Sequence, residues 1–356
     1  MRDAITRTRN KQNNFVPNFT EDIPVELRQD LRGEMFFRYV SGINSKSRTI
    51  IFVTKYKEGF ICKTNTWLID GTFKTAPLGF YQILTIHGYF LGRSYPLIYI
   101  FLKNKTEMIY TKAFIKIFEM FNSNPKYIIL DFEKALINAA EKVFLSSKNY
   151  NCLFHFGQSI WRWIQNKGLV TEYKTNKNFK ISIKLFLNLA FVPTQDLNRY
   201  YKAILNWIGE NGVQNLSSFI SYFEYTYFSI YDNNENIEQK CIFSASSWNA
   251  YERVLKNIPR TTNLVEGWHR AFNTKNEISH PNIARLINKM KEEEELNRFM
   301  IVKAYNGDFE LSHKDFKKEE KLRIFLNDIS LFTEIEYLLA IINIYGWKLD
   351  DEFFIV

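Results

Sequence analysis

The sequence predicts an α/β fold in which helices flank a mixed β-sheet, and three observations carry this prediction. Apolar runs of strand length recur between residues 49 and 156, which is typical of strands that are covered on both faces. Segments with apolar residues at helical spacing follow and separate these runs. The composition is that of a globular protein, because 46% of the 356 residues are hydrophobic and 24% are charged, which excludes disordered and fibrous classes.

The N-terminal part, residues 1–64, is expected to be a linker followed by a helix and a strand. Residues 1–30 are polar and contain two prolines, so we interpret them as an extended lead-in. Apolar residues at helical spacing predict a helix over residues 25–40. The apolar run over residues 49–56 predicts a strand.

Residues 65–156 contain the core pattern of the sheet. The runs predict strands at 66–70, 80–91, 94–104, 126–133 and 150–156, and helices at 106–121 and 134–146. Gly92-Arg93 between the second and third strands is a hairpin signal, and Thr106 is an expected N-cap. Three strands followed by alternating helices and strands is the order of the ribonuclease-H-like fold.

The rest of the chain is predicted to be helical. Long helical segments replace strand alternation over residues 157–260, which suggests a helical insertion before the sheet domain is completed. Residues 261–300 contain two helices that complete that domain, and residues 301–356 are a helical C-terminal extension. About two domains are expected at this length.

Two carboxylates end apolar strands of the core pattern. Asp70 follows one run and Asp131 follows another, and the topology makes their strands neighbours. Each could simply cap the turn that follows it, and for a single aspartate this is the better interpretation. Two at matching strand ends instead favour a site for a hard divalent cation, which prefers oxygen ligands.

A third acid is expected from the helix at residues 263–273. Leu264, Trp268 and Phe272 recur at helical spacing, and we expect them to form its apolar stripe. Another face carries Glu266, His269, Arg270 and Asn273, a set that suits the wall of a polar site. From periodicity alone, a solvated face is the alternative interpretation.

Cys152 and His155 form a C-x-x-H pair, which is half of a zinc site. No second pair lies nearby, so we do not expect zinc and instead favour a role beside the carboxylates, with Cys152 as a buried hydrophobic residue as the alternative. A basic stretch follows, in which Arg162, Lys167, Lys174 and Lys177 are candidates for contacts with a phosphate backbone. A solvated helix face explains the same residues equally well.

Charge and cysteine content narrow the class of protein further. A net charge of +9 permits a polyanionic partner without requiring one. Three cysteines argue against a disulfide framework. The longest apolar run, near Tyr337–Trp347, is too short for a membrane span, and the first residues lack the apolar region of a secretory signal.

Taken in order, these motifs resemble the Mutator-like element (MULE) transposases. The resemblance rests on WLIDGTFKTAP, FYQILTIHGYF, YIILDFEKALINA, CLFHFGQSIWRWIQNKGL, LNLAFVPTQDL, TTNLVEGWHRAFN and SHPNIARLINKMKEEE, and covers about residues 65–300. It implies a DDE recombinase with a ribonuclease-H-like core, whose acidic triad falls on Asp70, Asp131 and Glu266. The family's C-x-x-H falls on Cys152 and His155.

The resemblance also implies cofactors and partners. Two Mg²⁺ or Mn²⁺ ions are expected on the triad, and double-stranded DNA, as transposon ends and target, is the expected partner. A homodimer or larger assembly on DNA and a nuclear location follow from the same family. His269 and Arg270 are expected to help position DNA.

Three other readings remain open. The first is a truncated or domesticated derivative that binds DNA without cutting it. Many relatives carry an N-terminal zinc-binding module, often of the FLYWCH type, whose ligands residues 1–64 do not supply. The second is a different nuclease on the same fold, such as a ribonuclease. The third is a basic α/β domain without a site.

Overall fold

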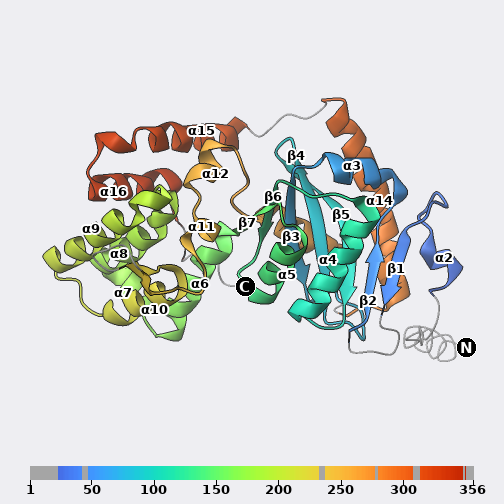
Figure 1. The fold of residues 1–356 in the computed structure, drawn as a ribbon, viewed down its shortest axis with the longest axis horizontal. Helices are drawn as coiled ribbons and strands as arrows, with labels where there is room; N and C mark the ends of the chain where they lie inside the picture. Colours follow the sequence, from blue (N-terminus) through green and yellow to red (C-terminus); the bar gives the residue numbers. More distant parts are fainter. Residues whose placement is uncertain are drawn as a thin grey trace, which may run out of the picture. The chain divides into compact units, whose positions relative to one another are not determined.

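A computed structural model describes residues 23–41, 47–231, 237–276, 280–307, 313–347 and 349. The chain divides into two compact units (Figure 1). The first combines residues 1–149 with 262–310, and the second combines residues 150–261 with 311–356.

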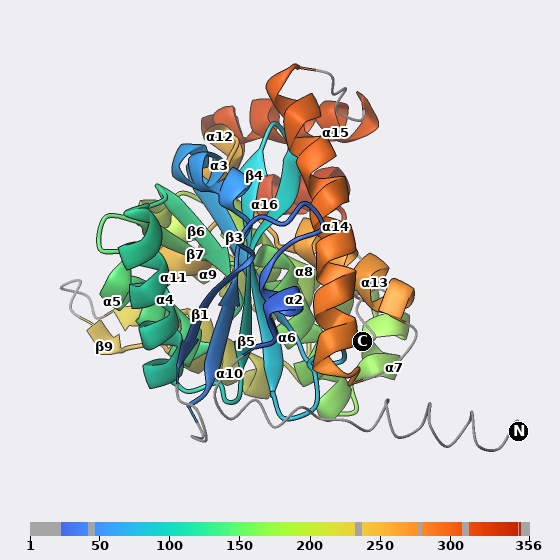
Figure 2. The same ribbon diagram turned by 90° about the vertical axis from the view of Figure 1, so that its right-hand side faces the viewer.

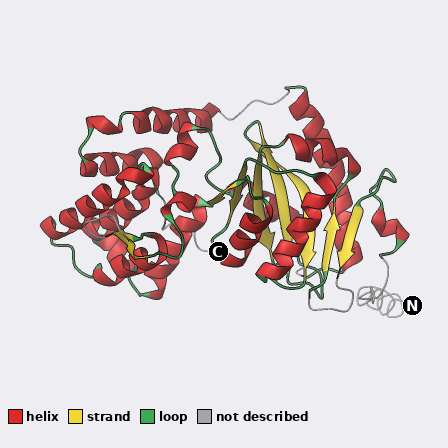
Figure 3. Cartoon of the chain, in the orientation of Figure 1, coloured by secondary structure: helices red, strands yellow, loops and turns green. Residues whose placement is uncertain are grey.

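A seven-stranded mixed sheet organises the first unit, in the order β1-β2-β5-β4-β3-β6-β7 (Figure 3). Its strands are β1 (Phe37–Ser41), β2 (Thr49–Phe52), β3 (Thr66–Thr72), β4 (Gln82–Phe90), β5 (Arg93–Leu102), β6 (Tyr127–Leu130) and β7 (Lys148–Asn151). The pairs from β1 to β3 are antiparallel, and β3 pairs with β6 in parallel. This confirms the predicted α/β class with a mixed sheet, and the element order is consistent with a ribonuclease-H-like fold.

Helices cover both faces of this sheet (Figure 2). One face carries α4 (Glu107–Phe121) and α5 (Lys134–Val143), which pack against each other. The other face carries α13 (Asn263–Asn276), which packs on β3 and β5, and α14 (Ile283–Tyr305), which packs on β5. Both faces are therefore buried, as the continuous apolar strands predict.

Two local predictions are wrong. The helix expected over residues 25–40 is limited to α2 (Val25–Arg28), because the chain turns at Gly33, whose φ of +79° is left-handed, and then enters β1. The strand expected over residues 150–156 ends at Asn151, and α6 (Leu153–Asn166) begins two residues later. A short apolar run suits a buried helix as well as a strand.

A buried ion pair fastens α14 to the sheet. Lys57 lies in the short 3₁₀ helix η1 (Lys55–Lys57), and its ammonium contacts the Glu294 carboxylate of α14, with side chains 0% and 1% exposed. The hydroxyls of Thr54 and Tyr99 donate to the same carboxylate at 2.7 and 2.9 Å. The buried charge of Glu294 is thus matched by one cation and by hydrogen-bond donors, as burial requires.

The second unit is mainly helical, and residues far apart in sequence build its interior. Tyr337 donates to the carbonyl of Phe191 at 2.6 Å, and the Trp347 indole donates to Asn188 at 2.7 Å. The two-stranded ribbon β8 (Ile230–Tyr231) and β9 (Ile237–Gln239) shows that residues 157–260 are not helical throughout. The remaining helices are α7 (Val170–Thr175), α8 (Lys177–Asn188), α9 (Leu197–Glu210), α10 (Ser217–Tyr227), α11 (Ala245–Trp248), α12 (Tyr251–Leu255), α15 (His313–Asn327) and α16 (Glu334–Tyr345).

Short helices also connect longer elements in both units. These are α3 (Glu58–Lys63) and the 3₁₀ turns η2 (Leu189–Phe191), η3 (Thr194–Asp196) and η4 (Ile329–Leu331). Within the described ranges, none of the helices has the length and apolar character needed to cross a bilayer.

Candidate active site

The register of the two parallel strands brings the first two acids together. Trp67 of β3 lies opposite Ile128 of β6, and Leu68 lies opposite Ile129. The same register, continued by two residues, sets Asp70 opposite Asp131. Adjacent strands are about 4.8 Å apart, so this continued register would bring the backbones of the two residues side by side where β6 ends.

Asp70 is held by its own backbone and by helix α13. Its Oδ1 accepts the Gly71 N–H at 2.8 Å, and its Oδ2 lies 3.1 Å from Nδ1 of His269. Both side chains are buried, at 7% and 8% exposure. A carboxylate buried to this degree is stabilised by such donors, which also fix its orientation.

Thr85 of β4 completes this arrangement. It is the cross-strand partner of Asp70, so the two side chains lie on one face of the sheet. The Thr85 hydroxyl donates to the Asp70 carbonyl at 3.2 Å and lies 3.0 Å from Nε2 of His269. Both ring nitrogens of His269 therefore have a neighbour on the sheet, which fixes the orientation of the imidazole.

Glu266 lies one helical turn before His269 on α13. Residues three apart share a helix face, so Glu266 is on the side that meets β3. Its side chain is half-buried, and its Oε1 atom is buried. The three predicted acids, Asp70, Asp131 and Glu266, all belong to the first unit.

The predicted apolar stripe of α13 is partly wrong. Leu264 is 44% exposed, whereas Val265 and Phe272 are buried. The buried face of α13 is thus formed by Val265, His269 and Phe272 and not by a stripe that includes Leu264. His269 is buried because it contacts Asp70 of β3, and hydrophobic periodicity does not predict a buried histidine. Arg270 is exposed.

Trp268 joins α13 to α14. Its ring stacks on Phe272 with centroids 4.8 Å apart, and its indole N–H donates to Glu293 of α14 at 2.8 Å. Next to Trp268 lies His87, whose side chain is fully buried. Burial, followed by the charges of His269 and Lys57, lowers the pKa of His87 well below its usual value, so this imidazole is neutral.

A hydrogen-bond chain on the opposite face supports the loop that carries Asp131. Glu133 accepts from the Tyr110 hydroxyl at 2.9 Å, and Gln82 donates to the same hydroxyl. Burial raises the Tyr110 pKa, so its proton stays in place. A Cβ at Gly71 would lie 2.8 Å from Oε1 of Gln82, so a larger residue directly after Asp70 would displace the Gln82 amide that donates to Tyr110.

The other predicted residues belong to the second unit. Cys152 is the buried residue before α6, and His155 lies in the first turn of that helix and not at the end of a strand as predicted. The side chains of Arg162, Lys167, Lys174 and Lys177 are exposed on α6, α7 and α8 and on the turn after α6.

Several contributing residues escaped prediction from the sequence. Thr85 and His87 interrupt an apolar strand at alternate positions, so they share a face, and this was the available signal. Nothing in the sequence pairs Lys57 with Glu294 or Glu133 with Tyr110, because each pair is joined only by the fold.

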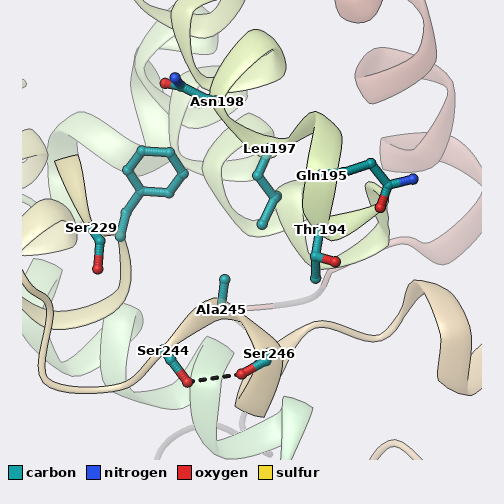
Figure 4. A pocket seen from close by; sticks show the side chains of 9 residues that line it. Thr194, Gln195, Leu197, Asn198, Ser229, Ser244, Ala245 and Ser246 are labelled. Carbon is teal, nitrogen blue, oxygen red and sulfur yellow. Dashed lines mark hydrogen bonds between the residues drawn. The ribbon is translucent and has the colours of Figure 1, made fainter. Parts of the chain in front are cut away.

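The second unit also contains a cavity of about 590 Å³ (Figure 4). Neutral side chains line it, among them Thr194, Asn198 and Ser229, and the hydroxyls of Ser244 and Ser246 lie 3.0 Å apart. It offers no charged group for a metal ion or a phosphate, so the acidic cluster is the better candidate for chemistry.

One comparison with known proteins finds a family that part of the chain matches. Residues 66–159 match the family model of the MULE transposase domain. This segment is a MULE transposase domain. The MULE domain runs from β3 into α6 and includes both Asp70 and Asp131, so the family resemblance of the sequence is confirmed, and with it a transposase-related function. Glu266 lies beyond the matched residues, and no curated protein matches the chain.

The donor set of the cluster suits a divalent cation. Three carboxylates supply oxygen ligands of the kind that Mg²⁺ and Mn²⁺ prefer. Two of these carboxylates, those of Asp131 and Glu266, each have one oxygen atom, Oδ1 and Oε1, that is buried from solvent. If the three carboxylates come close together they repel one another, and a bound cation relieves that repulsion.

Proposed function

We propose that the protein is a DDE-type DNA transposase that cleaves and joins strands at transposon ends. The observation that supports this proposal is the parallel pairing of β3, which contains Asp70, with β6, which Asp131 follows directly, within the residues that match the MULE transposase domain. Glu266, on the helix that contacts Asp70 through His269, is the proposed third acid. Residues 157–260 are, in this proposal, an insertion before that acid.

The proposed chemistry is phosphoryl transfer. A water oxygen attacks the phosphorus at a transposon end, the bond from phosphorus to the 3′ oxygen breaks, and the 3′ oxygen leaves as a hydroxyl. That hydroxyl then attacks a target phosphodiester and displaces the target's own 3′ oxygen. Two bound Mg²⁺ or Mn²⁺ ions would supply activation of the nucleophile and charge stabilisation, so no side-chain nucleophile is needed.

The chain's own residues have separate tasks in this scheme. Asp70, Asp131 and Glu266 hold the ions, and His269 with Thr85 keeps the Asp70 carboxylate in position. We propose that Arg270 contacts DNA close to the site. Arg162, Lys167, Lys174 and Lys177, together with other exposed cations, would follow the phosphate backbone. Cys152 and His155 are proposed to support the site, with no zinc involved.

The proposed partners follow from the substrate. A transposon has two ends, so we propose a homodimer or larger assembly on double-stranded DNA. Chromosomal DNA as substrate places the protein in the nucleus.

The test is nicking of supercoiled plasmid in Mn²⁺ by the full chain. Asp70→Asn and Asp131→Asn should each lower the rate by about a thousandfold or more, because metal ions supply several kcal/mol of transition-state stabilisation. The matched control is Asp328→Asn, which changes an exposed aspartate of the second unit and should cut normally. Cleavage by Asp131→Asn at the normal rate would overturn the proposal. DNA binding without cleavage by the unmodified chain would instead indicate a non-catalytic derivative.

A further inference from the structure

Two large aromatic rings lie exposed beside each other on the loop that leaves the acidic cluster. Phe73 follows β3 and Tyr81 precedes β4, and their side chains are 46% and 45% exposed. Their ring centroids are 5.3 Å apart, with the planes at 78°. By contrast, the aromatic residues of the strands in this unit are buried or half-buried, and Phe52, Trp67 and Tyr99 are among the buried ones.

The loop that presents these rings is well anchored. Thr75, Ala76 and Pro77 at its centre are buried. The N–H of Ala76 donates to the Phe73 carbonyl at 3.2 Å. The backbone N–H of His280 donates to the Lys74 carbonyl at 3.1 Å, which ties the loop to the chain just before α14. The loop therefore buries its small residues and turns its two rings outward.

The surroundings of the rings are positively charged. Lys74, Lys103 and Lys105 are exposed, and the Lys105 ammonium lies 5.7 Å from the centroid of the Tyr81 ring. No acidic residue occurs between Phe73 and Tyr81. Exposed rings combined with lysines suit a ligand that has flat apolar faces and negative charge, which describes a nucleic-acid strand with unstacked bases.

The position of the rings links them to the proposed reaction. Phe73 is three residues after Asp70, so their Cα atoms are at most about 11 Å apart. A strand whose phosphate lies at the acids would therefore bring its neighbouring bases to this loop.

We propose that Phe73 and Tyr81 form a stacking site for an unpaired base of the DNA strand held at the acidic cluster. This inference rests on the proposed function, and it adds a binding site that recognises base planes without reading sequence. Lys74 and Lys105 hold the adjoining phosphates.

The experiment measures binding of the full chain to two probes without added divalent metal. One is a short duplex with a 3′ overhang that carries 2-aminopurine, and the other is the same duplex with blunt ends. Phe73→Ala and Tyr81→Ala should each weaken overhang binding by about five- to tenfold, as expected for loss of one base–ring stack, and should reduce quenching of 2-aminopurine. Blunt-duplex affinity should change less than twofold.

Two further variants make the result specific. Phe73→Trp keeps an aromatic plane and should bind the overhang at least as well as the unmodified chain. Phe299→Ala removes a ring that is 58% exposed on α14, sixteen residues after Ile283, or about 24 Å along the helix, and should change nothing.

The outcomes separate this inference from the proposed function. Unchanged overhang binding by both alanine variants overturns the stacking site, as does an equal loss for both probes. If the unmodified chain binds the overhang through these rings but never cleaves in Mn²⁺, the proposed activity fails and the stacking site stands.

Discussion

Helices α13 and α14 both bind the same face of the sheet through a buried carboxylate, but with opposite charge balance. On α14, Glu294 meets Lys57 and accepts from Thr54 and Tyr99, so one acid faces one cation. On α13, His269 meets the buried Asp70 carboxylate at 3.1 Å, one helical turn after Glu266. The first arrangement is complete within the protein, whereas the second holds a carboxylate that we propose binds an added cation. This contrast separates a structural ion pair from a candidate active site.

The largest effect on stability is expected at the α14 pair. Lys57→Met leaves the Glu294 carboxylate buried without its cation, so the free energy of unfolding should fall by about 3–5 kcal/mol. Adding Glu294→Leu should recover most of this loss, because no uncompensated charge remains. Denaturant unfolding of the single and double variants measures both values. A double variant no more stable than Lys57→Met would show that the pair is not balanced as described.

A smaller effect, on activity more than on stability, is expected at the α13 contact. His269→Ala frees the Asp70 carboxylate to reorient and should reduce Mn²⁺ affinity or plasmid nicking by about 10- to 100-fold. Leu264→Ala on the exposed side of the same helix is the control and should retain activity. Equal rates for both variants would exclude a positioning role for His269.

Acid sensitivity is expected from His87. Its pKa is lowered in the folded chain, so the folded state stays neutral while the unfolded chain takes up a proton below about pH 6.5. Stability is therefore complete above that pH and falls as the pH decreases, by about 1 kcal/mol at pH 5.5. His87→Leu should remove this part of the pH dependence in unfolding experiments at pH 7.5 and 5.5. The same slope in both proteins would contradict the assignment.

The smallest effect is expected on the opposite face, at Tyr110. Tyr110→Phe removes the hydroxyl between Gln82 and Glu133, which should cost about 1–2 kcal/mol of stability. It should also loosen the loop after Asp131, which hydrogen exchange of residues 131–133 would detect. Unchanged exchange there would show that this chain of hydrogen bonds does not hold the loop.

The sequence predicted the structure correctly where the residue pattern within a single strand or helix determines that element. The strands from β3 to β6 are apolar on both faces, so their order and the positions of Asp70 and Asp131 could be predicted. The helix predicted over residues 25–40 was wrong because the apolar residues there have helical spacing, whereas the chain makes a left-handed turn at Gly33.

The contacts around the acids could not be predicted because they join distant elements. His269 is about two hundred residues from Asp70, and Glu294 lies even further from Lys57. No periodicity reports such contacts. The rotation of α13, which exposes Leu264 and buries Val265, likewise depends on how His269 meets the sheet.

We propose that Asp70, Asp131 and Glu266 form one cation site. Calorimetric titration of the full chain with Mn²⁺, with and without a short duplex, tests this beside Asp131→Asn and Glu133→Gln. We expect about two ions per chain, lost in Asp131→Asn but kept in Glu133→Gln, whose carboxylate instead accepts the hydrogen bond from Tyr110. Equal Mn²⁺ binding by Asp131→Asn and the unmodified chain, or no binding even with DNA, would contradict it.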